Sequence, residues 1–386
     1  MLSAAATTLT SAALAPKSVV KVLPKPRAHW VGDGFHVHPI LGSLAFSGAV
    51  SPFLLLDYAA PKHFPPTAKR LGVGQHPHRG FETVTIAFQG QVEHADSLGN
   101  TDTIGVGDVQ AKTHTDFSPL VVTPHCSHRS RHLVRVQHAQ WMTAGRGIIH
   151  EEFHARSFAK QGGTFEMVQL WASLPPHCTD PAHVSHPMLP ICHAPSCVHL
   201  GQPSRRAQDD CAALPADPRR QHTDCQHTDH PREQSGWGRG PRREGGCEAE
   251  GSDGARVRVI AGAFRGRAGP AKTFTPIELW EVILPKPAEP VELEVPEGQN
   301  TLLLVRSGGA SLVGAAEERI GGQSLAVLST AGRKLRLVGH EADTRLLLMS
   351  GTPIDEPIAA RGPFVMNTMT EIAQANQDFM SGVLGR

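Results

Sequence analysis

Long apolar runs are missing from this chain of 386 residues. No stretch approaches the ~18 consecutive apolar residues of a membrane-spanning helix, so we predict a soluble protein with no membrane partner. The chain also lacks an excess of either charge, because its 37 lysines and arginines nearly balance its 36 aspartates and glutamates. This balance predicts no direct contact with nucleic acid and favours a small-molecule partner.

Helical periodicity is scarce in a chain that holds 38 glycines and 31 prolines. Residues 81–88 (FETVTIAF) alternate and are rich in β-branched side chains, and Gln89 and Gly90 then break the pattern. Such short alternating runs separated by turns predict an all-β protein.

Cysteine is missing from most of the chain. All seven cysteines and more than half of the histidines lie within residues 111–140 or 176–250. Their spacings do not make a complete zinc site, and the odd count argues against a disulfide framework. The second stretch shows no period of 2 or 3.6 and cannot easily bury a core. We interpret both stretches as insertions in a β scaffold. One alternative that the sequence leaves open is that they are translated intron sequence.

The N-terminal residues 1–27 contain no acidic residue, and Lys17 is their one basic residue before position 20. This composition is compatible with an organellar transit peptide and also with a flexible extension, which we favour because no clear amphipathic face appears. In the second case we expect a cytoplasmic or nuclear protein.

Two pairs of side chains have the spacing of a metal site. His76 and His78 are two residues apart, as are His150 and Glu152. Successive side chains of a strand point to opposite faces, so each pair places both members on one face. One ion can then bind both pairs if the fold brings the strands together.

The motifs around these pairs resemble the pirin family of the cupin superfamily. The resemblance lies in residues 76–84 (HPHRGFETV) and in 107–110 joined to 141–150 (GDVQ, WMTAGRGIIH). It continues through residues 165–171, 256–262, 269–273 and 362–368.

The resemblance implies two tandem cupin-type (jelly-roll) β-barrels and a tail. Residues 28–175 would form a metal-binding barrel that contains the insertion 111–140, and residues 176–250 would be a disordered insertion or linker. Residues 251–353 would form a second barrel without metal. Residues 354–386 would form a tail whose helix packs back on the first barrel, with a capping box at Thr368 and Glu371. The apolar stripe of this helix is Ile372, Ala375, Phe379 and Met380.

The same resemblance implies one non-haem metal ion held by His76, His78, His150 and Glu152. Iron is expected, and Mn, Cu, Ni and Zn also suit such donors. Glu82 is a rival for the carboxylate ligand, because the general cupin pattern takes its carboxylate a few residues after the H-x-H pair. Glu151 should point away from the site.

The other histidines of the first barrel are interpreted as hydrogen-bonded structural residues: His36, His38, His94 and His154. The turn at Gly145 and Gly147 should bring His150 back toward the first pair. Arg79 and Arg146 are expected either to hold carboxylates beside the site or to lie on its rim.

Two functions follow from the resemblance. In the first, the protein is a quercetin (flavonol) 2,3-dioxygenase: a monomer that binds a small aromatic substrate and O2, with Glu152 accepting the proton of the 3-hydroxyl group. In the second, it is a non-enzymatic transcriptional cofactor, and the redox state of its metal controls the binding of a protein partner.

Overall fold

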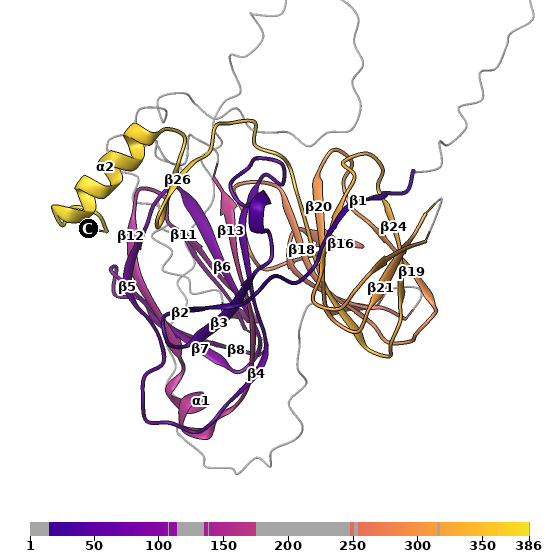
Figure 1. Ribbon diagram of the computed structural model, residues 1–386, viewed down its shortest axis with the longest axis horizontal. Helices are drawn as coiled ribbons and strands as arrows, with labels where there is room; N and C mark the ends of the chain where they lie inside the picture. The colour runs from indigo at the N-terminus through magenta and orange to yellow at the C-terminus, as the bar shows by residue number, and fades with distance from the viewer. Residues whose placement is uncertain are drawn as a thin grey trace, which may run out of the picture. The chain divides into compact units, whose positions relative to one another are not determined.

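The computed structural model describes residues 15–106, 108–113, 135–137, 139–174, 248–250, 254–314 and 317–385. Strands dominate these ranges, and the helices within them are α1 (Arg156–Gln161), α2 (Met369–Met380) and the short 3-10 turn η1 (Gly42–Leu44). No helix of the described part is long and apolar enough to cross a membrane. The strands build two barrels in tandem, drawn in indigo to magenta and in orange to yellow in Figure 1, which confirms the predicted fold class.

The first barrel consists of two sheets packed against each other. The larger has the order β10 (Arg135–Gln137), β9 (Asp108–Thr113), β11 (Ala139–Thr143), β6 (Phe81–Gln89), β13 (Gly163–Ser173), β4 (Phe53–Phe64), β3 (Phe35–Pro39), β2 (His29–Val31). The smaller has the order β5 (Gly72–His78), β12 (Ile148–His154), β7 (Gln91–Asp96), β8 (Thr101–Gly105).

The second barrel repeats this plan. Its larger sheet has the order β1 (Val19–Leu23), β23 (Leu325–Leu328), β20 (Asn300–Ser307), β25 (Thr344–Gly351), β18 (Ile277–Leu284), β15 (Arg256–Ala261), β14 (Glu248–Glu250). Its smaller sheet has the order β19 (Pro290–Glu294), β24 (Lys334–Gly339), β21 (Ala310–Val313), β22 (Glu317–Ile320). Two short hairpins complete the strands: β16 (Ala263–Phe264) with β17 (Arg267–Ala268), and β26 (Ala359–Arg361) with β27 (Phe364–Met366).

The strand β6 is buried on both faces, although its sequence includes Glu82, Thr83 and Thr85 among apolar residues. One face lies inside the first barrel, where Ala87 belongs to a core cluster with Met167 and Val92. The other face carries Val84 and Ile86, which pack in a cluster that includes residues of the second barrel. The two faces of this sheet therefore have different neighbours, the interior of the first barrel on one side and residues of the second barrel on the other.

The N-terminal segment differs from the sequence expectation. Val19–Leu23, within the predicted extension 1–27, forms β1 and pairs antiparallel with β23 of the second barrel. The Lys17 ammonium donates to the carbonyl of Ser329 at 2.7 Å. Figure 1 shows this indigo strand among the orange strands. Its backbone supplies the hydrogen bonds that β23 would otherwise lack at the sheet edge, and its three valines favour the extended conformation. The first 14 residues lie outside the described part.

The ends of the first predicted insertion belong to the first barrel. Strand β9 extends to Thr113, β10 covers Arg135–Gln137, and β11 begins at Ala139. β9 pairs parallel with β11 and antiparallel with β10, so these ends enlarge the sheet rather than loop away from it. Of the predicted insertion 176–250, only the strand β14 is among the described residues.

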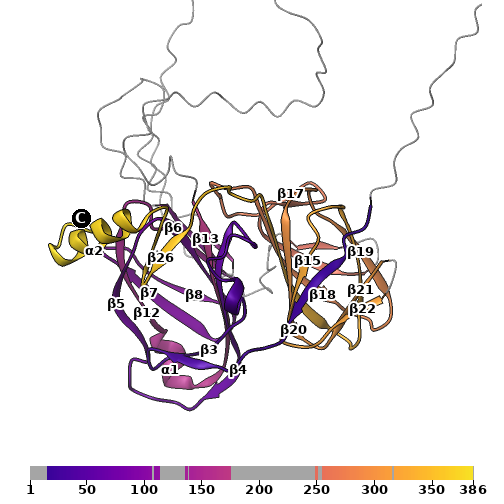
Figure 2. The ribbon, with the colours of Figure 1, turned by 45° about the horizontal axis from the view of Figure 1, so that its top comes forward.

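The C-terminal helix α2 starts with the predicted capping box. The Thr368 side chain accepts from the backbone N–H of Glu371, and the Glu371 carboxylate accepts from the backbone N–H of Thr368. The helix and the residues after it pack on the first barrel, where Ile372 and Leu384 cluster beside Ile149 of β12. Figure 2 shows α2 beside β12 and β26. The outer part of the predicted stripe is open to solvent, since Met380 is 83% exposed.

Candidate metal centre

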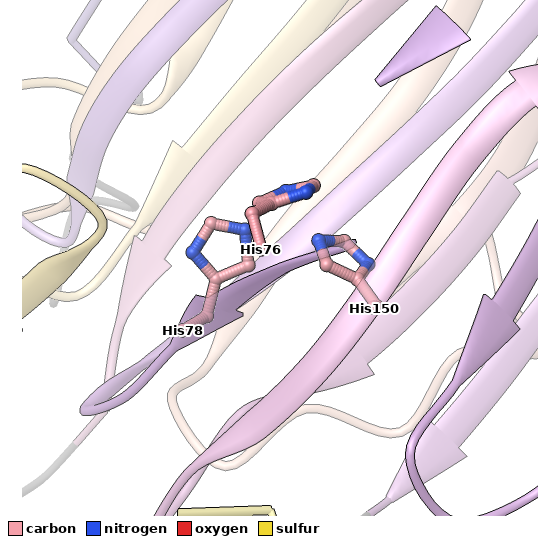
Figure 3. Close-up of side chains that lie close together, drawn as sticks. All are labelled: His76, His78 and His150. Atoms are coloured by element: carbon pink, nitrogen blue, oxygen red, sulfur yellow. The ribbon is translucent and has the colours of Figure 1, made fainter. Parts of the chain in front are cut away.

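Two neighbouring antiparallel strands, β5 and β12, carry the three predicted histidine ligands. His150 lies opposite His76, and Ile148 lies opposite His78, so the three histidines share one face of the sheet. The ring centroid of His150 is 4.3 Å from that of His76 and 4.7 Å from that of His78. Figure 3 shows the three rings turned toward one another. Their ligating nitrogens lie within 4.8 Å of one another, as expected for donors to one ion.

The fourth predicted ligand, Glu152, lies on the same strand beside a histidine that the sequence did not connect with the metal. His94 of β7 is the register partner of Glu152, and its Nε2 donates to Glu152 Oε1 at 2.7 Å. Thr85 Oγ1 donates to the same oxygen at 3.2 Å. Glu152, His94 and His150 form a second group of donor atoms within 4.8 Å. The candidate ligands thus fall into two overlapping groups that share His150.

The rival carboxylate Glu82 lies on the other face of its sheet. It is opposite Thr143, whose hydroxyl donates to Glu82 Oε1 at 2.7 Å. Thr85, three residues later on β6, points to Glu152, and strand alternation therefore turns Glu82 toward the second barrel. Neither group of candidate metal donors in the described part contains Glu82. Burial raises the pKa of this carboxyl to about 7, against the opposing effect of the Thr143 hydrogen bond.

The site electrostatics keep the donors in their metal-binding forms. Burial and the neighbouring His76 lower the pKa of His78 to about 4, so its imidazole is neutral at neutral pH. Burial would raise the pKa of Glu152, but His94, His76 and His78 together lower it to about 2. Metals bind neutral imidazoles and ionised carboxylates, so these residues fit a borderline divalent ion.

Backbone carbonyls orient two of the imidazoles. His76 Nδ1 lies 2.9 Å from the carbonyl oxygen of Gly74, and His78 Nδ1 lies 3.1 Å from that of Pro363. When Nδ1–H donates to a carbonyl, the lone pair of the neutral ring is on Nε2, which is then free to ligate a metal. The second carbonyl comes from the segment that leads to β27, so the C-terminal tail takes part in positioning His78.

The predicted glycine turn brings β12 back to β5. The backbone N–H of Gly80 donates to Gly145 O, and that of Gly147 donates to Ala144 O. Gly147 has φ +133°, and a Cβ there would lie 2.6 Å from Leu384 of the tail. Both a left-handed backbone and a close approach therefore require glycine at this position.

The remaining predicted residues lie around this centre. Arg79 donates to the carbonyl of Arg146 at 2.6 Å and pairs with Asp378 of α2 at 2.7 Å, so it holds a carboxylate of the tail. Glu151 pairs with Arg70 at 2.9 Å, on the face away from the site.

Three predicted structural histidines lie outside the candidate site and contact other residues. His38 Nδ1 lies 2.7 Å from Pro26 O, and His154 Nε2 lies 2.9 Å from Gly34 O. The ring of His36 lies 5.0 Å from that of Trp30.

Within the described residues, both groups of candidate metal donors lie in the first barrel. The interior of the second barrel is filled by an apolar cluster around Trp280, Leu303 and Leu348. Its His340 Nε2 lies 2.8 Å from Ser311 Oγ.

Two parts of the chain match protein-family profiles. Residues 34–115 and 122–172 match the family described as Pirin. Residues 280–385 match the Pirin C-terminal cupin domain. The first match contains all four predicted metal ligands, and the second includes α2.

Individual proteins match over nearly their whole length. A Pseudomonas aeruginosa protein named putative quercetin 2,3-dioxygenase is 36% identical over 366 residues, which cover 95% of this chain and 98% of that protein. The pirin-like protein of Solanum lycopersicum is 28% identical, and the match covers 96% of this chain and 94% of that protein. The crystal structure of a quercetin 2,3-dioxygenase from Acinetobacter baumannii is 34% identical with a TM-score of 0.66, and 95% of this chain and 98% of that one are covered. The similarity thus includes both barrels.

Proposed function

The chain belongs to the pirin family of cupin proteins, and from this membership we propose that it is a metal-dependent quercetin 2,3-dioxygenase. The observation that carries the proposal is the group of three imidazoles, His76, His78 and His150, inside the first barrel, together with Glu152, which shares a second donor group with His150 and is held by His94 and Thr85. The names of the bacterial relatives support the same activity.

We assign the resident ion to His76, His78, His150 and Glu152, with iron as the expected metal. When bound there, the ion would polarise the oxygens of a flavonol and allow reaction with O2. The second group of donors suggests that His94 holds Glu152 in place from the side opposite His76.

Glu152 is the group that we expect to accept the proton of the substrate's 3-hydroxyl. Its low pKa keeps it ionised at neutral pH, and both of its hydrogen bonds within the described part end on Oε1. Oε2 is then available to the ion or to the hydroxyl proton. The deprotonated flavonol would take up both atoms of O2, and its central ring would open with release of one carbon as carbon monoxide.

The test uses the purified full-length protein, stripped of metal and reloaded separately with Fe, Mn, Cu, Ni or Zn. Quercetin in air should give ring-cleaved product with at least one of the redox-active ions, and the zinc form is the control for passive binding. Absence of product with all of these ions would contradict the proposal.

The ligand assignment is tested by metal content. His78→Ala and Glu152→Ala should lose bound metal, whereas Glu82→Gln should retain it, because Glu82 faces the second barrel. Unchanged metal content in both alanine variants would overturn the assignment.

A further inference from the structure

Four polar side chains form a row across four neighbouring strands of the first barrel. Gln140 of β11 is the register partner of Thr85 of β6, Thr85 is that of Gln169 of β13, and Gln169 is that of Asp57 of β4. Register partners lie on the same face of a sheet. Neighbouring strands are about 4.8 Å apart, so the row spans about 14 Å.

The row faces the interior of the barrel, where the candidate metal donors lie. Thr85 Oγ1 is 3.2 Å from Glu152 Oε1 and 2.7 Å from Gln169 Oε1. A hydroxyl has one proton, so Thr85 donates to one of these oxygens at a time. The middle of the row is thereby connected to the carboxylate at the metal centre.

The two ends of the row carry polar atoms whose hydrogen-bonding capacity is unused. Gln140 is 1% exposed, and neither its amide oxygen nor its amide nitrogen has a hydrogen-bond partner among the described residues. At the other end, the buried Oδ1 of Asp57 likewise has no such partner within the described part. Buried polar groups in proteins are normally hydrogen-bonded, so water or a bound molecule is expected to complete these contacts.

Apolar and aromatic side chains border the row on both sides. On one side, the next inward-facing positions are Met142, Trp171 and Leu55, with the polar Thr83 on β6 among them, and on the other side they include Ala87 and Met167. The Trp171 ring lies 5.2 Å from the ring of His78, so the aromatic border reaches the metal ligands. This combination suits a flat aromatic molecule with hydroxyl groups on its periphery.

We propose that the row is a subsite for the ring hydroxyls of a polyphenolic substrate, with Gln140 and Asp57 binding hydroxyl groups remote from the metal. The inference rests on the proposed flavonol chemistry and specifies which flavonols the site prefers. It assigns to Gln140 a role in substrate binding rather than in metal binding.

The experiment measures binding of two flavonols to the full-length, metal-loaded protein without O2, by the change in flavonol absorbance. Quercetin carries hydroxyls on both outer rings, and 3-hydroxyflavone has only the hydroxyl beside the ketone. Wild-type protein should bind quercetin at least about tenfold more tightly, as expected for added buried hydrogen bonds.

Gln140→Met keeps the size of the side chain and removes its amide. It should abolish most of the preference for quercetin while leaving 3-hydroxyflavone affinity and metal content unchanged. Gln161→Met, on the exposed surface of α1, is the matched control and should keep the preference. Equal wild-type affinity for the two flavonols, or equal weakening of both by Gln140→Met, would overturn the inference. If Gln140→Met does not fold, the comparison of quercetin with 3-hydroxyflavone binding to the wild-type protein remains, and equal affinities there would still overturn the inference.

Turnover in air separates this inference from the proposed function. A quercetin preference that depends on Gln140 but comes without ring cleavage would refute the dioxygenase and support the subsite. Cleavage of both flavonols with the same kcat/KM would support the dioxygenase and refute the subsite.

Discussion

The face of the strand on which a carboxylate lies decides its role in this protein. Glu82 and Glu152 are both buried and both close in sequence to a predicted histidine ligand, and their spacing alone does not separate them. The hydrogen bonds do, because Glu82 accepts from Thr143 on one face of the sheet and Glu152 accepts from Thr85 on the other. Their opposite pKa changes follow from these surroundings.

The raised pKa of Glu82 predicts a pH-dependent stability. Its pKa is about 7 in the folded protein and lies near 4.5 when unfolded, so the folded state binds the proton more tightly. The contribution of Glu82 to stability is therefore fully present below pH 4.5, is lost as pH rises from 4.5 to 7, and changes little above that range. Glu82→Gln mimics the protonated form and should be within about 1 kcal/mol of the wild type at pH 5. At pH 8 it should be more stable, by up to roughly 3 kcal/mol.

Urea unfolding of wild type and Glu82→Gln at the two pH values measures this difference. Comparing the two proteins at each pH cancels the titration of groups that they share. A stability difference that does not change between pH 5 and 8 would show that Glu82 titrates normally.

His94 should act through Glu152 rather than as a metal ligand. His94→Phe removes the hydrogen bond to Glu152 Oε1 and should weaken metal binding about 10- to 100-fold, the usual effect of losing such a partner. His76→Phe should abolish stoichiometric binding. Competition with a chelator measures both affinities, and complete loss of metal in His94→Phe would instead identify His94 as a ligand.

The sequence predicts best those parts of the site whose residues are close together in the chain. The spacing of His76 and His78 already places both on one face of a strand, and the structure brings them to His150. His94 has no such neighbour in sequence, and it reaches the site because β7 pairs with β12 opposite Glu152. That register is set by tertiary packing and could not be read from either strand alone.

At the scale of elements, the tail contacts the candidate metal centre. The residues before β27 supply the carbonyl that orients His78, and Arg79 is paired with Asp378 of α2. The helix was predictable because its capping box is local. The contact between Pro363 and His78 joins residues 285 positions apart and has no local signature.

Gly80→Ala tests the link between the tail and the site. An added Cβ would lie 1.9 Å from the carbonyl oxygen of Val365, and Gly80 has φ +91°. The variant should shift β27, lower the melting temperature and weaken metal binding. Gly99→Ala is the matched control, since Gly99 has φ +81° and a Cβ added there would meet nothing within 4 Å among the described residues.

Both glycine variants carry the cost of a left-handed alanine, about 1 kcal/mol. Only Gly80→Ala should lose more stability than that and also lose metal affinity. Equal effects in the two variants, measured by thermal unfolding and metal titration, would show that the tail does not position His78.

At the scale of the whole molecule, a buried cation joins the two barrels. Arg306 of β20 is 1% exposed, and its guanidinium contacts Glu166 of β13 at 2.9 Å and Glu281 of β18 at 2.5 Å. Tyr58 Oη donates to Glu166 at 2.8 Å, and the guanidinium carbon lies 3.2 Å from the centre of the Phe88 ring. Sequence periodicity predicts the two barrels but not this contact, since Arg306 stands at the end of an ordinary apolar strand.

Arg306→Met should destabilise the protein by about 3–5 kcal/mol, because it leaves the buried Glu166 carboxylate without its cation, whereas Glu281 keeps its ion pair with Arg258. The double variant Arg306→Met/Glu166→Gln should recover part of this loss. Urea unfolding measures both, and additive effects of the two substitutions would show that Arg306 and Glu166 do not interact.

The pairing of β1 with β23 has a consequence for biosynthesis. The backbone N–H of Ser18 bonds Ser329 Oγ, 311 residues later in the chain. At about 5–20 residues per second, a ribosome needs roughly 15–60 s to make the partner of a strand that has already emerged. During that interval the apolar residues of β1 have no sheet to join, and Lys21 in their midst is the kind of charge that discourages aggregation. The second barrel can complete its sheet only with the strand that was made first.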